Sequence, residues 1–123
     1  MSVLVSVVIP TYNRADDLAR ALDSVLRQTY PRWEALVIDN RSTDNSHDVV
    51  HRLNDARIRW LEIANNGVIA ASRNLGIYHA SGEFIAFLDS DDYWKSDKLE
   101  RSIFWLSRDF DIVYHDMHIV NYH

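Results

Sequence analysis

The 123-residue chain contains no cysteine and has only three glycines and two prolines. Without cysteine it can form neither disulfide bonds nor thiolate metal sites. Acidic residues outnumber basic ones, 18 against 13, and the net charge of −5 argues against a nucleic-acid partner, whose binding surface would be basic. No glycine-rich phosphate loop follows the first apolar run, which argues against a nicotinamide-binding Rossmann domain or a P-loop.

Long hydrophobic runs are also missing. The apolar run at residues 3–10 lacks a basic leader and is too short for a signal peptide or a membrane span, so we expect a buried strand there. We therefore expect a cytoplasmic protein, with attachment to the periphery of a membrane left open. Apolar residues make up 47% of the chain, and we expect residues 1–123 to form a single domain.

Apolar runs alternate with helix-like stripes along the chain. Strands are predicted at residues 4–10, 33–39, 58–62, 84–88 and 112–114, the third of them near a sheet edge. Helices are predicted between them, and Gly82 is expected to cap the third helix at its end. This order predicts an α/β fold: a Rossmann-like, mostly parallel sheet with helices on both faces.

Polar residues follow three of the predicted strands, at residues 11–13, 39–40 and 89–92. In open parallel sheets, ligands bind beyond the carboxyl ends of the strands, where the strand order reverses. We therefore expect these three groups to meet at one edge of the sheet and to form a ligand site.

Asp89, Asp91 and Asp92 lie within four residues of one another. Their mutual repulsion would be relieved by a cation, and an all-oxygen set suits Mg²⁺ or Mn²⁺. Two carboxylates are too few to enclose such an ion, so they suit one that also binds a ligand's phosphates. The alternative is a surface turn followed by helix caps, and the residues alone leave both interpretations open.

Three other side chains have two interpretations each. Asp39 could bind a ligand at the end of its strand or cap the next helix. Arg73 lies inside the third predicted helix and could extend into solvent or reach a diphosphate with its planar donors. Tyr12 could stack on a base or pack against its neighbours.

Four segments together resemble the family 2 glycosyltransferases, a large inverting group with the GT-A fold. They are residues 5–14, 36–44, 66–76 and 82–92, and they occur in the family's order and at its spacing, between about residues 3 and 116. The resemblance implies the nucleotide-sugar-binding half of a GT-A fold. The donor would be a nucleotide sugar, most often a uridine one, and an acceptor hydroxyl would attack it directly.

The resemblance also implies roles for individual residues. Those that would hold the nucleotide sugar are Thr11, Tyr12, Asp39, Arg73 and Asp89. Within this set, Asp39 would contact the base, Arg73 would approach the diphosphate, and Asp89 would contact the ribose or the sugar. Asp91 would bind the metal ion, Mn²⁺ or Mg²⁺.

Two features depart from the family pattern. Asn40 and Arg41 replace the usual Asp-Gly pair, which adds charge and bulk to that loop. Family members also continue into an acceptor-binding half that carries the catalytic carboxylate, and Asp116 is the only acid beyond the fifth predicted strand. We therefore assign no catalytic base, expect a truncated chain, and expect its uncovered apolar surface to favour homo-oligomers.

Three rival functions remain at this point. The chain could bind a nucleotide sugar without transferring it, or it could be a nucleotidyltransferase, although the first loop is a poor match for a triphosphate cradle. A phospho-acceptor signalling domain would need paired acids after the first strand, where the sequence has none. The acceptor, a saccharide or a lipid-linked sugar, is not identified by the sequence.

Overall fold

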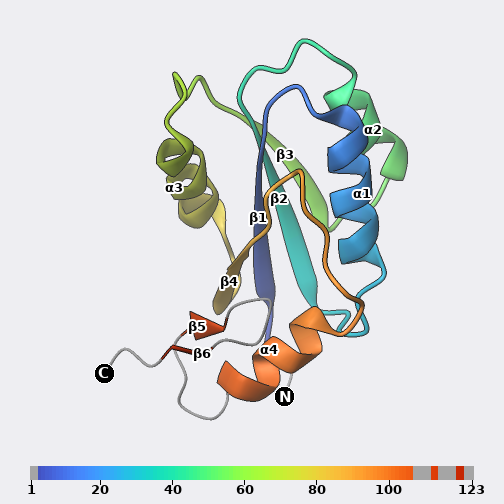
Figure 1. The fold of residues 1–123 in the computed structure, drawn as a ribbon, viewed down its shortest axis with the longest axis vertical. Helices are drawn as coiled ribbons and strands as arrows, with labels where there is room; N and C mark the ends of the chain where they lie inside the picture. Colours follow the sequence, from blue (N-terminus) through green and yellow to red (C-terminus); the bar gives the residue numbers. More distant parts are fainter. Residues whose placement is uncertain (1–2, 107–111, 114–118, 121–123) are drawn as a thin grey trace.

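The computed structural model describes residues 3–106, 112–113 and 119–120 (Figure 1). The strands are β1 (Val5–Thr11), β2 (Trp33–Asp39), β3 (Ile58–Glu62), β4 (Phe84–Phe87), β5 (Ile112–Val113) and β6 (Ile119–Val120). The helices are α1 (Ala15–Leu26), α2 (Ser46–Leu53), α3 (Ile69–His79) and α4 (Lys98–Leu106). No helix in the described part of the chain is both long enough and apolar enough to cross a membrane.

Four strands form one parallel sheet in the order β3-β2-β1-β4. Residues 5–11 of β1 pair in register with residues 33–39 of β2. Every residue of β1 is buried, which explains why its sequence is almost continuously apolar rather than alternating. β3 lies at an edge of this sheet, as the sequence predicted, and the α/β fold is confirmed.

Helices cover both faces of the sheet, with α1 and α2 on one side and α3 on the other (Figure 1). Val7 and Ile9 of β1 belong to the larger core cluster, together with Leu18 of α1. Val8 points to the opposite face, because side chains alternate along a strand, and it packs in a second cluster that includes Leu75 of α3. This two-sided burial fixes the register, and the register decides which loops meet at the carboxyl edge.

The predicted role of Gly82 as a helix cap is wrong. Helix α3 ends at His79, and its C-cap residue Ala80 has an extended backbone with ψ 135°. A Cβ atom on Gly82 would lie 2.6 Å from Ser6 Oγ and 2.7 Å from the Leu4 carbonyl oxygen. Glycine is therefore required here because the chain passes close to the start of β1.

The fifth predicted strand exists in part but does not join the parallel sheet. β5 covers residues 112–113 and pairs antiparallel with β6 in a separate two-stranded sheet. Residue 114 and Asp116 lie outside the described residues. A short apolar run predicted an extended segment but carried no information about its partner strand.

Candidate functional site

A cleft of about 1010 Å³ opens at the carboxyl edge of the parallel sheet. It lies at the position where strand order reverses, because β2 and β3 are on one side of β1 and β4 is on the other. Its lining comes from residues 10–17, 40, 44–45, 65, 67, 69, 73 and 89–91. The sequence led us to expect the connections after β1, β2 and β4 at one site, and the connection after β3 also contributes to it.

Most of the predicted site residues lie in this cleft. Those in the lining are Thr11, Tyr12, Arg73, Asp89 and Asp91. Asp39 is the exception, since it is only 1% exposed and is not part of the lining.

Thr11 ends β1 and is buried, yet its Oγ1 atom has no hydrogen-bond partner among the described residues. A buried hydroxyl without a partner costs free energy, so such atoms call for an explanation. The Thr11 carbonyl oxygen accepts a hydrogen bond from the Asn40 amide at 3.0 Å, which holds the backbone in place. The hydroxyl is therefore a fixed, buried polar group beside the floor of the cleft, which Thr11 lines.

The Asp39 carboxylate is engaged by the loop that follows β2. It accepts hydrogen bonds from the Ser42 amide at 2.8 Å and from the Ser42 hydroxyl. Asp39 does not cap α2; the carboxylate near the start of that helix is Asp44, which accepts the Ser46 amide at 3.0 Å. Asp39 is the register partner of Thr11, so it lies beside the cleft floor.

Asn13 and Asp44, to which the sequence analysis assigned no individual role, lock the first two loops together. Asn13 has a left-handed backbone, φ 48°, and its Oδ1 atom accepts hydrogen bonds from the amides of Thr43 at 2.7 Å and Asp44 at 3.3 Å. Asp44 in turn accepts the Ala15 amide at the start of α1, at 3.1 Å. An asparagine directly after a buried strand is a signal for such a left-handed turn, but its partners lie about thirty residues away in sequence.

The charge state of Asp44 follows from these contacts. Burial raises the pKa of Asp44, but hydrogen bonds from the Ser46 hydroxyl and from the Ser46 and Ala15 amides outweigh it and hold the pKa below its usual value. Asp44 is therefore ionised at neutral pH and connects α1 with α2 at the cleft wall.

Arg73 extends from α3 toward the loop after β4. Its Nη2 atom lies 3.4 Å from Asp89 Oδ1, and its guanidinium carbon lies 5.7 Å above the centre of the Phe87 ring. Both side chains of the ion pair are largely exposed, 43% and 60%, so the pair itself adds little stability. The Arg73 Nε atom is buried and has no hydrogen-bond partner in the described part of the chain, although Arg73 itself lines the cleft.

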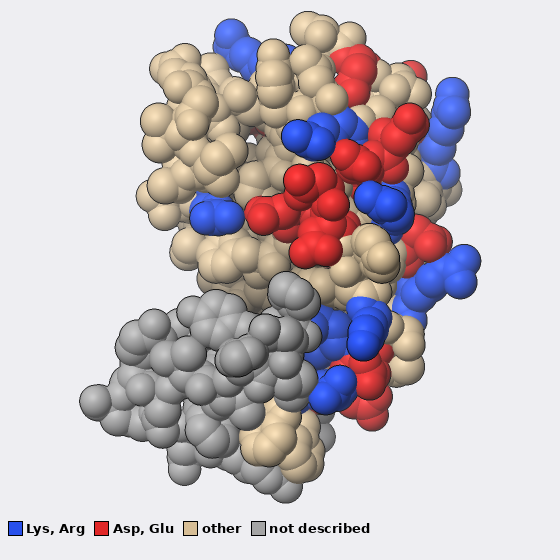
Figure 2. All heavy atoms as spheres, viewed as in Figure 1, with Lys and Arg blue, Asp and Glu red and all other residues tan. Residues whose placement is uncertain are grey.

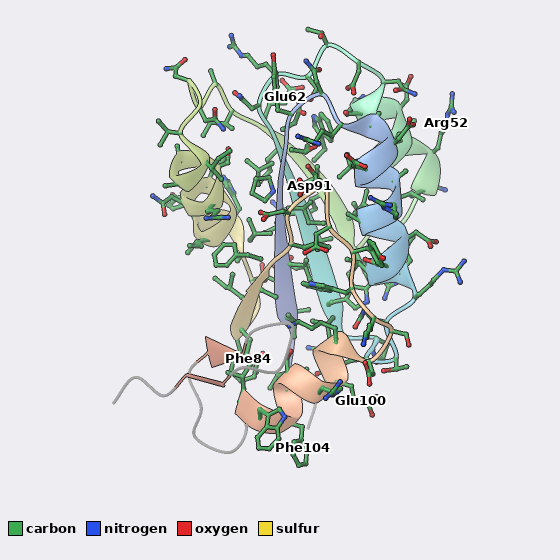
Figure 3. The ribbon with its side chains drawn as sticks, viewed as in Figure 1. Arg52, Glu62, Phe84, Asp91, Glu100 and Phe104 are labelled. Carbon is green, nitrogen blue, oxygen red and sulfur yellow. The ribbon has the colours of Figure 1, made fainter. Side chains whose placement is uncertain are left out.

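The loop after β4 crosses in front of the sheet, and Asp91 lies near its tip (Figure 3). Asp92 is used within the loop, since its amide donates to the Asp89 carbonyl and its carboxylate accepts the Tyr93 amide at 2.8 Å. Asp91 is exposed and has no partner in the part of the chain that the structure describes. The turn interpretation is thus correct for Asp92, and Asp91 is left free to bind a ligand.

The donor set of this loop can be compared with the needs of a metal ion. The described residues contain no group of three or more His, Cys, Asp or Glu side chains that could hold a metal. Asp89 and Asp91 supply carboxylate oxygens on an open cleft, which suits an ion that keeps waters and takes other ligands from phosphates. The residues therefore fit Mg²⁺ or Mn²⁺ bound together with a phosphorylated ligand.

A parallel sheet with an open polar cleft at its switch point is the arrangement of nucleotide-binding α/β proteins. This chain belongs to glycosyl transferase family 2, whose family model matches residues 6–123. The predicted family and its glycosyltransferase class are thereby confirmed.

Two relatives illustrate the match. The chain is 41% identical over 119 residues to the Escherichia coli UDP-Glc:alpha-D-GlcNAc-diphosphoundecaprenol beta-1,3-glucosyltransferase WfgD, covering 96% of this chain and 47% of that protein. It is 40% identical over 102 residues to the Streptococcus pneumoniae glycosyltransferase GlyG, covering 81% and 34%. The chain therefore spans less than half the length of these relatives.

Solved structures agree with the fold. S. aureus TarS 1–349 in complex with UDP superposes with a TM-score of 0.79 at 30% identity, covering 85% of this chain and 32% of that one. The mannosyltransferase PcManGT from Pyrobaculum calidifontis, in complex with GDP-Man and Mn²⁺, gives a TM-score of 0.77 at 31% identity, covering 84% and 32%.

Proposed function

We propose that this chain is the donor-binding part of an inverting glycosyltransferase, which holds a nucleoside-diphosphate sugar, preferably a UDP-sugar, through a divalent metal ion. The observation that carries the proposal is the convergence of Thr11, Arg73 and Asp91, from three separate elements, on one cleft at the switch point. Complexes of similar chains with UDP, and with GDP-Man and Mn²⁺, support it.

The proposed roles follow the positions of the side chains. Thr11 and Tyr12 would hold the nucleoside from the end of β1, with the buried Thr11 hydroxyl as a fixed hydrogen-bonding group. Arg73 would leave Asp89 and donate to the diphosphate, since its planar fork matches phosphate oxygens. Asp89, once released, would face the ribose or the sugar.

Asp39 is proposed to contact the base at the floor of the cleft. Ser42 occupies two of the roughly four acceptor positions of its carboxylate, so positions remain for an N–H group of the base. The base would have to displace part of the Ser42 loop to reach it.

Asp91 is proposed as the metal ligand. The ion, when bound, would neutralise charge that develops on the departing nucleoside diphosphate. The acceptor hydroxyl must also lose a proton to a general base. We assign no such base in the described residues, and Asp116 lies outside them.

A second candidate function is a binding module that transfers nothing by itself. It is favoured by the fact that we assign no general base among the described residues. Turnover of a UDP-sugar with a panel of acceptors, compared with binding of the same donor, separates the two functions.

The acceptor is proposed to be a saccharide or a lipid-linked sugar, because the WfgD relative is named for a diphosphoundecaprenol-linked substrate. Such an acceptor would bring a cytoplasmic domain to the periphery of a membrane.

We also propose self-association through the exposed apolar side chains of α3 and β4, chiefly Tyr78, Ile85 and Phe87. A monomer at all concentrations in size-exclusion chromatography would contradict self-association.

Calorimetric titration tests the donor site. UDP is titrated into the whole chain with Mn²⁺ and then with a chelator. Asp91→Asn should abolish the metal-dependent part of the binding, whereas Asp92→Asn, which keeps an acceptor for the Tyr93 amide, should not. Failure of UDP, GDP and dTDP to bind with metal present would refute the proposal.

A further inference from the structure

The cleft lining is acidic for a site that would hold an anionic donor. It contains five carboxylates and two guanidinium groups, those of Arg14 and Arg73. Figure 2 shows acidic side chains gathered where the loop after β4 crosses the sheet, beside a largely uncharged surface over α3. Arg14 Nη1 already lies 3.3 Å from Asp17 Oδ2. The position of the Arg73 guanidinium, the cation that α3 contributes, is therefore important for the approach of a diphosphate.

The position of Arg73 depends on the rotation of α3 about its own axis. Most helices are oriented by a stripe of large apolar side chains that faces the core. In α3, however, only Ser72 and Gly76 are buried, and both are small. Leu75 is partly buried, and Tyr78 is 82% exposed. Apolar burial therefore specifies the rotation of this helix only weakly.

A buried hydrogen bond provides a second restraint on the rotation. Asn65 Nδ2 donates to Ser72 Oγ at 2.8 Å, and the two residues are only 5% and 1% exposed. Because a hydrogen bond weakens steeply as its geometry departs from the ideal, this bond resists rotation of α3. Ser72 is the residue directly before Arg73, so the same bond restrains the helix position from which Arg73 reaches the cleft.

Asn65 uses all of its polar groups. Its amide donates to Asn40 Oδ1 at 3.0 Å, and its carbonyl oxygen accepts the Val68 amide at 2.9 Å. Its Oδ1 atom accepts the Gly67 amide at 2.8 Å, which directs the Nδ2 group toward Ser72. Asn65 therefore connects the loop after β2 with α3 through a fixed set of hydrogen bonds.

A small change in the rotation of α3 would be enough to disturb binding. A group about 6 Å from a helix axis moves by about 2 Å when the helix turns by about 20°. A shift of that size breaks a hydrogen bond, because hydrogen-bond lengths vary by only about 0.5 Å. The ion pair between Arg73 and Asp89 is largely exposed and contributes little to holding the guanidinium in place.

We infer that Asn65 and Ser72 are positioning residues for Arg73, and that their hydrogen bond fixes the rotation of α3 at which the guanidinium meets the donor's diphosphate. This inference rests on the proposed donor site. Ser72 is the residue to test, because it is 1% exposed and is not part of the cleft lining. Asn65 lines the cleft, where a ligand can contact it directly.

Calorimetry with UDP and Mn²⁺ on the whole chain measures this role in a double-mutant cycle. Ser72→Ala should weaken UDP binding roughly three- to tenfold, which is the range that one hydrogen bond contributes. In an Arg73→Met background the same substitution should change the affinity by less than about 1.5-fold, because no guanidinium is left to position.

Two controls accompany the cycle. Ser24→Ala also removes a buried helical serine, whose hydroxyl donates to the Ala21 carbonyl oxygen at 2.6 Å in α1, and it should leave UDP binding unchanged. Urea denaturation shows whether each variant is folded. If Ser72→Ala is not folded, Ser72→Cys takes its place in the same cycle, because it keeps the shape of the side chain and replaces the oxygen by a weakly accepting sulfur.

The outcomes separate this inference from the donor site. Equal weakening by Ser72→Ala with and without Arg73 would mean a general structural role and would overturn the inference. Unchanged UDP binding in Ser72→Ala, or in Arg73→Met, would overturn it as well, while metal-dependent binding of UDP would still support the donor site. Failure of the unsubstituted chain to bind UDP would overturn the donor site and this inference together.

Discussion

Replacing Gly76 by alanine should destabilise the protein, although alanine is the better helix former. Gly76 lies in α3 where that helix crosses β1, and a Cβ atom there would lie 2.4 Å from Val8 Cγ1 and 2.9 Å from Val8 Cγ2. Val8 is fully buried in the centre of the sheet and β-branched, so it has little freedom to move aside.

Two opposing terms set the magnitude. Alanine gains about 1 kcal/mol over glycine in a helix interior. Overpacking a well-filled core costs about 1–3 kcal/mol, and a contact this short belongs at the upper end. We expect a net loss of about 1–2 kcal/mol, which for a chain of this size lowers the Tm by roughly 4 °C per kcal/mol.

Urea denaturation of a double-mutant cycle measures the overpacking cost between residue 76 and Val8. Val8→Ala alone should cost about 2 kcal/mol through the cavity it leaves. In the Gly76→Ala/Val8→Ala double variant the new methyl group has room, so the combined loss should be smaller than the sum by about 1 kcal/mol or more. Asn74→Ala, an exposed position of the same helix, is the control and should change stability by less than about 0.5 kcal/mol.

The same substitution links packing to the site. Arg73 lies one turn before Gly76 in α3, so pushing the helix away from β1 should also weaken UDP binding. Unchanged or increased stability of Gly76→Ala, together with an additive cycle, would refute the close approach of α3 to β1.

Three further outcomes are expected. Thr11→Val should leave the free energy of unfolding unchanged or raise it, because the lost hydroxyl has no partner in the described structure. The same substitution should weaken UDP binding about fivefold in calorimetry, and a loss of stability would contradict the expectation. Asn13→Ala should lower the free energy of unfolding, measured in urea, by about 1–2 kcal/mol, because alanine cannot accept the Thr43 amide and tolerates a positive φ less well than asparagine. An unchanged urea midpoint would count against the role of Asn13 in holding the first two loops together. The pKa of Asp44 is lowered on folding, so its contribution to stability is present above the unfolded value of about 3.9 and is lost as pH falls through the lower folded value. The stability advantage of wild type over Asp44→Asn should therefore be constant near neutrality and disappear below about pH 4, and a constant advantage down to pH 2 would refute it.

The sequence was sufficient to predict the sheet because burial on both faces leaves a strong signal. The apolar runs of β1 and β2 admit few other structures, and strands alternating with helices imply parallel pairing. The position of the cleft followed from the same reasoning, since it depends only on which strand ends share an edge. The roles of Thr11, Arg73 and Asp91 in binding remain predictions.

The features that the sequence did not reveal depend on distant contacts. Gly82 resembled a helix cap because it follows α3. Glycine is required there because the backbone passes close to Ser6 and Leu4, more than seventy residues earlier. The bond from the Thr43 amide to Asn13 joins residues thirty apart, and no local pattern specifies that pairing. The hydrogen bonding of Asp39 to Ser42 could not be predicted for another reason: an aspartate at the end of a strand can equally well cap the next helix or bind a ligand.

The two walls of the cleft differ in a way that bears on how the proposed donor would bind. The wall formed by the loops after β1 and β2 is held by hydrogen bonds that Asn13, Asp39 and Asp44 accept from backbone amides, so most of its shape is set before a ligand arrives. The wall formed by the loop after β4 presents Asp89 and Asp91 on an open surface, with too few protein ligands to retain a divalent ion unaided. Under the donor-site proposal, the nucleoside therefore meets a largely preformed wall in which only part of the Ser42 loop has to move, and the metal ion is held only once the diphosphate completes its coordination. This order explains why a site with five carboxylates in its lining can still favour an anionic donor, because the ligand brings the cation that compensates for the repulsion.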